Sequence, residues 1–102
     1  MFSKSQKTII NIDDKNHLNW KLCLKNELGK ISSTNIEINC KSLDLYCSDI
    51  LELIEISDQY NCKVMSFFST SIKTIVSSKA LGYTAYFITD SYSNNTLNIN
   101  NL

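Results

Sequence analysis

The chain has 102 residues, and its ten basic residues balance its ten acidic ones, so its formal net charge is zero. Nucleic-acid binders usually carry a basic excess gathered on one face, so this balance argues against a nucleic-acid partner. Two glycines and no proline exclude a collagen-like chain and disfavour a loop-rich one. The length fits one domain with a single hydrophobic core.

Four short segments predict β-strands. The first is KTIINI at residues 7–12, which is rich in β-branched side chains, and the second is NIEINC at residues 35–40, where isoleucines alternate with polar residues. The third, CKVMSFF at residues 62–68, is a nearly continuous apolar run, typical of a strand that is central or covered on both faces. YTAYFI at residues 83–88 completes the set.

Residues 16–28, NHLNWKLCLKNEL, predict the first helix. Its apolar side chains recur at helical spacing and form a broad stripe, followed by Gly29 as a stop signal. The stripe comprises Leu18, Trp20, Leu22, Leu24 and Leu28.

The segment CSDILELIEISDQYN predicts the second helix. Ser48 or Asp49 is expected to cap its start, and Asp49 with Glu52 three residues later has the form of a capping box. Asn61 is the expected left-handed stop. The core face is expected to comprise Ile50, Leu53, Ile54 and Ser57.

The segment STSIKTIVSSKALGY, residues 69–83, predicts the third helix. Ser69, Thr70 or Ser71 can cap its start, and Gly82 followed by Tyr83 gives a left-handed stop. Helical spacing predicts an apolar face of Ile72, Ile75, Val76 and Ala80, together with Lys79, opposite Lys73, Ser77 and Ser78.

The order of these elements predicts an α/β fold. We expect a small, mixed or mainly parallel four-stranded sheet with three helices in βαβαβαβ order, occupying residues 1–88. Residues 89–102 hold five asparagines and few apolar residues, so we expect a flexible tail or the start of a linker there. In the core, the sheet residues Ile36, Ile38, Val64 and Phe68 are expected to pack against Leu22, Ile54 and Ile72.

The sequence offers no constellation for catalysis, and no catalytic, cofactor-binding or metal-binding residue is assigned. His17 is the only imidazole, and the adjacent Asp13 and Asp14 suit a solvated turn before a helix better than paired acid–base work. Phosphate-binding glycine motifs and the nucleophile elbow are absent. Six aromatic residues could form a platform on which nucleic-acid bases stack, but we expect them to pack in the hydrophobic core instead. They are Trp20, Phe67, Phe68, Tyr83, Tyr86 and Phe87.

The cysteines and the hydropathy pattern indicate a reduced, cytoplasmic protein. No C-x-x-C pair joins the four cysteines, so we expect free thiols and no zinc. No apolar run approaches the roughly 18 residues of a membrane span, and the amino terminus lacks the apolar stretch of a signal peptide. The cysteines are Cys23, Cys40, Cys47 and Cys62.

Three stretches together resemble the amino-terminal domain of the septum-site-determining MinC family, in particular its branch from oxygenic photosynthetic bacteria. They are NWKLCLKNELGK, NIEINCKSLDL and DILELIEISDQYNCKVMSFFSTSIKTIVSSKALGYTAYF, and the resemblance covers roughly residues 16–88. It rests on Trp20 leading the first helix, the leucine-rich second helix, the hydroxyl residues 69–71 and the Gly82–Tyr83 stop. The third helix departs from the family in being less rich in alanine.

The resemblance implies a cell-division inhibitor that binds the tubulin-like FtsZ and weakens its polymers, without enzymatic activity or cofactor. Members of the family carry a second domain that dimerises and binds the ATPase MinD, so MinD is an expected partner only if such a domain is supplied. An alternative is a stand-alone regulator resembling STAS domains and switched by phosphorylation of Ser48, although LYCSDI lacks that family's Asp-Ser-(Ser/Thr)-Gly run.

Lys4, Lys7 and Lys15 are the residues that we expect to contact a partner. They cluster around the first predicted strand and the turn after it, at the end of the domain where the resemblance places the inhibitory contacts. FtsZ polymers are generally acidic, so exposed lysines are natural contacts. These lysines equally suit a second role, which is to keep an exposed edge strand from pairing with other chains.

Overall fold

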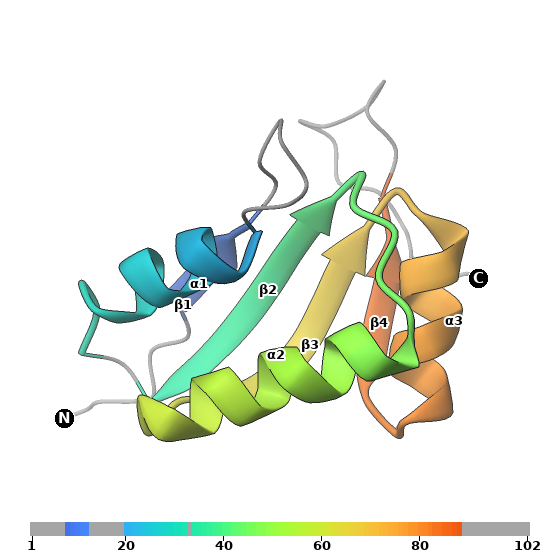
Figure 1. Ribbon diagram of the computed structural model, residues 1–102. Coiled ribbons are helices and arrows are strands. Elements are labelled where there is room, and N and C mark those ends of the chain that lie inside the picture. Colours follow the sequence, from blue (N-terminus) through green and yellow to red (C-terminus); the bar gives the residue numbers. More distant parts are fainter. Residues whose placement is uncertain (1–7, 13–19, 33, 89–102) are drawn as a thin grey trace, which may run out of the picture.

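The computed structural model describes residues 8–12, 20–32 and 34–88 (Figure 1). Within these ranges the chain alternates strands and helices, as predicted from the sequence. The elements are β1 (Thr8–Asn11), α1 (Trp20–Leu28), β2 (Asn35–Lys41), α2 (Cys47–Gln59), β3 (Lys63–Ser69), α3 (Ile72–Ala80) and β4 (Thr84–Phe87).

The four strands form one sheet in the order β1-β2-β3-β4, and every neighbouring pair is parallel. The predicted α/β class and element order are therefore confirmed, with the sheet parallel throughout its described strands. Sequential parallel strands joined by crossovers of one hand place successive helices on the same face of a sheet. The three helices accordingly form a layer against one face (Figure 1).

The core lies between this helix layer and the sheet. Its central row crosses all four strands from Ile10 through Ile38 and Phe67 to Ala85, and each of these side chains is buried. The helices complete the same cluster with Trp20, Leu24 and Leu28 from α1, Ile50, Leu53 and Ile56 from α2, and Ile75 from α3.

The helix ends follow the predicted stop signals. Gly82 has a φ of 93° and Asn61 a φ of 61°, the left-handed conformation that closes a helix. The backbone amide of Tyr83 donates a hydrogen bond to the Ser78 carbonyl at 3.0 Å, and the backbone amide of Cys62 donates one to the Ser57 carbonyl at 2.9 Å. Each of these hydrogen bonds closes the turn that leads from a helix into the next strand.

The start of α2 differs from the prediction. Neither Ser48 nor Asp49 is the cap, because α2 begins at Cys47 and its capping residue is Tyr46. Asp49 lies in the first turn, where its carboxylate accepts a hydrogen bond from the Tyr46 amide at 3.0 Å. The acidic residue therefore still satisfies an open amide at the helix start.

The predicted packing was wrong for three side chains. Leu22 is 58% exposed and Ile72 is 60% exposed, so neither belongs to the core. Phe68 is half-buried and belongs to the face of the sheet away from the helices, because it pairs in register with Asn39. Ile54 packs partly buried against the core, while Ile36, Ile38 and Val64 are buried as predicted.

Helix α3 presents a hydroxyl-rich face to the core, which also contradicts the predicted apolar face. Thr74, Ser77 and Ser78 are buried beside Ile75, whereas Ile72, Val76 and Ala80 are exposed. The Thr74 hydroxyl donates to the Leu43 carbonyl at 2.6 Å and accepts from the Leu45 amide at 2.7 Å. The helix is therefore oriented by hydrogen bonds to the loop before α2.

Candidate partner-binding surface

The face of the sheet away from the helices is the candidate functional site. Strand register places its side chains in two rows that cross all four strands. No element in the described ranges covers this face, which we call the open face. One row comprises Ile9, Glu37, Ser66 and Thr84, and the other comprises Asn11, Asn39, Phe68 and Tyr86.

The alternation of side chains along a strand explains why the two faces of the sheet differ in composition. In β2, buried Ile36, Ile38 and Cys40 alternate with half-buried Glu37 and Asn39, as a period of two requires. The sequence of β2 therefore encodes one apolar face for the helices and one polar face, Glu37 and Asn39, on the side away from them.

An aromatic pair occupies the β3–β4 half of the open face. The rings of Phe68 and Tyr86 lie 5.1 Å apart between centroids and are tilted by 32°, within the range in which aromatic rings attract each other. On β1, at the opposite edge, Ile9 is 55% exposed. The open face thus carries apolar groups at both edges of the sheet.

Polar groups fill the middle of the open face. The Ser66 hydroxyl donates to the Glu37 carboxylate at 2.9 Å, and the Asn39 side chain accepts from the Lys41 amide at 3.0 Å. Among the residues of the two rows, Glu37 is the only carboxylate, and the rows contain no lysine, arginine or histidine. Aromatic and aliphatic groups beside hydrogen-bonding groups form a surface that could contact a partner protein.

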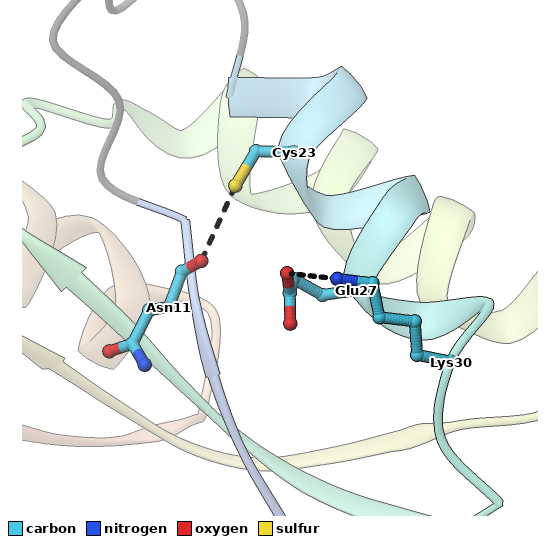
Figure 2. Close-up of polar contacts among 4 residues, drawn as sticks. All are labelled: Asn11, Cys23, Glu27 and Lys30. Atoms are coloured by element: carbon cyan, nitrogen blue, oxygen red, sulfur yellow. Dashed lines mark hydrogen bonds and ion pairs between the residues drawn. The ribbon is translucent and has the colours of Figure 1, made fainter.

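Figure 2 shows how α1 fixes the β1 edge of this surface. The Cys23 thiol donates to the backbone carbonyl of Asn11 at 3.4 Å, while the Asn11 side chain points away from α1. Lys30, in the turn after α1, forms an ion pair with Glu27 of that helix at 3.4 Å (Figure 2). One side of β1 is therefore held against the helix layer, and its other side faces outward.

Several residues singled out in the sequence lie outside the described residues. They are the three lysines expected to contact a partner (Lys4, Lys7 and Lys15), the candidate acid–base groups (Asp13, Asp14 and His17) and the predicted tail, residues 89–102. Lys7 directly precedes β1 in the sequence. Ser48 is described: it is exposed and lies in the first turn of α2.

The six aromatic residues are divided between the two faces of the sheet. Trp20 and Phe67 are buried in the core, and Tyr83 and Phe87 pack against it. The preference for core is confirmed for these four, but Phe68 and Tyr86 lie on the open face. The apolar run of the third strand was predicted to be central or covered on both faces; β3 is central, and a period of two along it would have placed Phe68 on the face opposite Phe67.

The cysteines come from four different places in the fold. Cys40 and Cys62 are buried, Cys23 is half-buried and Cys47 is exposed. The described residues hold no group of three or more histidine, cysteine or acidic side chains that could bind a metal ion. That the cysteines are reduced and metal-free stays a prediction.

A groove of about 670 Å³ lies at the amino-terminal ends of β2, β3 and β4. Its lining includes Asp58, Lys63, Tyr83 and Cys62, and burial raises the pKa of the Cys62 thiol. A raised pKa keeps the thiol protonated near neutral pH and therefore poorly nucleophilic. In open α/β sheets ligands usually bind at the carboxyl ends of the strands, which is the other edge, so we do not assign function to this groove.

No helix within the described ranges has the length and apolar character needed to cross a bilayer. The open face stays the candidate functional site, because no element in the described ranges covers it (Figure 1). Comparisons with protein-family models, with curated proteins and with solved structures found no match for this chain.

Proposed function

We propose that this chain is a cytoplasmic cell-division inhibitor module of the MinC amino-terminal type, which binds FtsZ through the open face and antagonises polymer assembly. The module acts by binding and has no reaction or cofactor of its own. MinD becomes a partner only where a second, MinD-binding domain is supplied. This proposal combines the resemblance in the sequence with the surface that the fold leaves open.

The observation that carries the proposal is the one-sided parallel sheet. Parallel sheets occur almost only where both faces are covered, yet the described helices cover one face of this sheet. The open face offers Ile9 at one edge and the Phe68–Tyr86 pair toward the other. Tyrosine is among the residues enriched at the energetic hot spots of protein interfaces, and phenylalanine is enriched at interfaces generally.

Three lysines that flank β1 in the sequence add an electrostatic component to the proposed binding of FtsZ. Lys4 and Lys7 precede β1 in the sequence, and Lys15 follows it. Basic groups accelerate encounter with an acidic partner and fix its orientation. The two rows themselves contribute only the Glu37 carboxylate, which is hydrogen-bonded to Ser66.

Co-sedimentation with FtsZ polymers tests the proposal. The parent chain should pellet with FtsZ and slow its assembly, and Ile9→Glu should reduce both effects strongly, because the change buries a carboxylate in the interface. Leu22→Glu is the matched control: Leu22 is equally exposed, at 58% against 55%, but belongs to α1 in the helix layer. The control should behave as the parent does.

Charge reversal of Lys4, Lys7 and Lys15 tests the electrostatic part separately. The triple variant should bind FtsZ more weakly and with less dependence on salt, since fewer charges are screened. If the triple variant and Ile9→Glu both slow FtsZ assembly as the parent does, the open face is not the binding surface. If the parent never associates with FtsZ, the proposed function itself is wrong.

Ser48 supports a second candidate, a STAS-like binding domain switched by phosphorylation. Its hydroxyl is exposed in the first turn of α2, where the helix dipole favours an added phosphate. Incubation with ATP and a cell extract from the source, followed by mass spectrometry, should detect phosphoserine at this position if the second candidate holds. Phosphate absent from Ser48 under these conditions would leave FtsZ binding as the sole proposal.

A further inference from the structure

Helix α3 has its apolar and polar residues distributed in the opposite way to an ordinary surface helix. Its buried side is Thr74, Ile75, Ser77 and Ser78, and its exposed side carries the aliphatic residues. Ile72 and Val76 are each 60% exposed, more than any other large hydrophobic residue in the described ranges. A helix that serves only as scaffold would be more stable with its aliphatic residues buried and its hydroxyl residues exposed.

The exposed aliphatic residues form a continuous line along the helix. Ile72, Val76 and Ala80 are spaced four residues apart, so their side chains lie one above another on one face. We call these three residues, with the flanking Lys73 and Lys79, the α3 ridge. A row at this spacing is the ridge that packs into the groove of a second helix in the commonest helix–helix geometry.

The charged residues on helix α3 itself all have the same sign. Helix α3 contains two lysines and no acidic residue. The Lys73 ammonium lies 5.6 Å from the centre of the Tyr46 ring, and its pKa is raised chiefly by hydrogen bonding to Tyr46, with a further contribution from the nearby Asp44 carboxylate. Lys73 is therefore a fixed cation at neutral pH, and Tyr46, which is itself exposed, extends the ridge at its amino-terminal end.

We propose that the α3 ridge is a docking site for an acidic amphipathic helix of a partner protein. The partner's apolar side would cover Ile72 and Val76, and its acidic flanks would pair with Lys73 and Lys79. Ala80 at the end of the line permits close approach of the second helix. This site belongs to the helix layer, opposite the open face, so the inference is independent of the proposed binding of FtsZ.

Titration of the ¹⁵N-labelled full chain with two synthetic peptides tests the inference by nuclear magnetic resonance. Both peptides are amphipathic helices with the same leucine face, but one carries glutamates and the other lysines along its flanks. The glutamate peptide should shift the amide signals of residues 72–80 and of Tyr46, and the lysine peptide should not. Lys73→Glu with Lys79→Glu should weaken binding of the glutamate peptide by about tenfold or more.

Matched variants separate the ridge from other exposed apolar groups. Ile72→Ser with Val76→Ser should abolish the shifts, whereas Leu22→Ser on α1 should leave them unchanged, since Leu22 has nearly the same exposure. Ile9→Glu on the open face should also leave peptide binding unchanged. Circular dichroism checks that each variant retains its fold.

Four outcomes would overturn the inference. The first is equal binding of both peptides, and the second is the absence of any shift in the amide signals of residues 72–80 at millimolar glutamate peptide. The third is that phosphatidylglycerol vesicles, and not the peptide, shift the amide signals of the ridge. The fourth is that these signals shift when the chain alone is concentrated. The third result would assign the ridge to an anionic membrane surface, and the fourth would assign it to a second copy of this chain.

Discussion

Helices α2 and α3 cover the same face of the sheet, but they use opposite kinds of side chain to do so. Helix α2 buries Ile50, Leu53 and Ile56 with one serine, Ser57. Helix α3 buries three hydroxyl residues with one isoleucine, Ile75. The comparison shows that a helix face can be buried either because it is apolar or because each of its polar groups has a partner.

The hydrogen bonds of α3 explain how its polar face is accommodated. Thr74 bridges the backbone of Leu43 and Leu45, and the Ser78 hydroxyl donates to the Thr74 carbonyl at 2.8 Å. Ser71 caps the helix and also donates to the Asp44 carboxylate at 2.5 Å. No buried side-chain nitrogen or oxygen among the described residues lacks a partner.

The largest effect is expected for the apolar face of α2. Leu53→Ala removes a fully buried side chain and leaves a cavity, so the free energy of unfolding should fall by about 2 to 5 kcal/mol. Urea denaturation followed by circular dichroism measures this change. A fall below about 0.5 kcal/mol would show that α2 does not pack through this face.

A smaller but clear loss is expected at the centre of the polar face of α3. Thr74→Val keeps the shape of the side chain but leaves the Leu45 amide and the Leu43 carbonyl without their partner, which should cost about 1 to 3 kcal/mol. Thr74→Ser is the matched control, because it retains the hydroxyl. If the valine variant is as stable as the serine variant, these hydrogen bonds do not orient α3.

The two helices can be compared directly at equivalent serines. Ser57 in α2 and Ser78 in α3 are both buried, and each donates to the carbonyl four residues earlier, at 2.9 and 2.8 Å. Replacing either serine by alanine should change the free energy of unfolding by about 1 kcal/mol or less, because the acceptor carbonyl keeps its place in the helix ladder. A much larger loss of stability at Ser78 alone would indicate that Ser78 stabilises the packing of α3 through more than its own hydrogen bond.

The smallest effect is expected on the outer side of α3. Ile72→Ser with Val76→Ser should alter the free energy of unfolding by no more than about 0.5 kcal/mol per residue, because both side chains are exposed. Thermal and urea unfolding should therefore nearly superimpose on those of the parent. A loss comparable to that of Leu53→Ala would mean that these side chains are buried in the folded chain.

The sequence by itself determined the element order and the carboxyl-terminal ends of α2 and α3. Both follow from local rules: a period of two or of 3.6 in apolar residues, and the left-handed conformation that Gly82 and Asn61 adopt at low cost. It also predicted most of the core face of α2, namely Ile50, Leu53 and Ser57, but it missed the buried Ile56 in favour of the half-buried Ile54. These features depend on interactions between residues close together in the chain.

Only the tertiary structure decided which side of α3 faces the core and which face of the sheet stays open. Helical spacing favoured burial of Ile72 and Val76, but Thr74 forms its hydrogen bonds with residues about thirty positions earlier in the chain, which no local pattern reveals. Likewise, Phe68 and Tyr86 become neighbours only when β3 and β4 pair in register. Both candidate surfaces depend on contacts between segments distant in sequence, and burial of a polar group is decided by the partner that such a contact supplies.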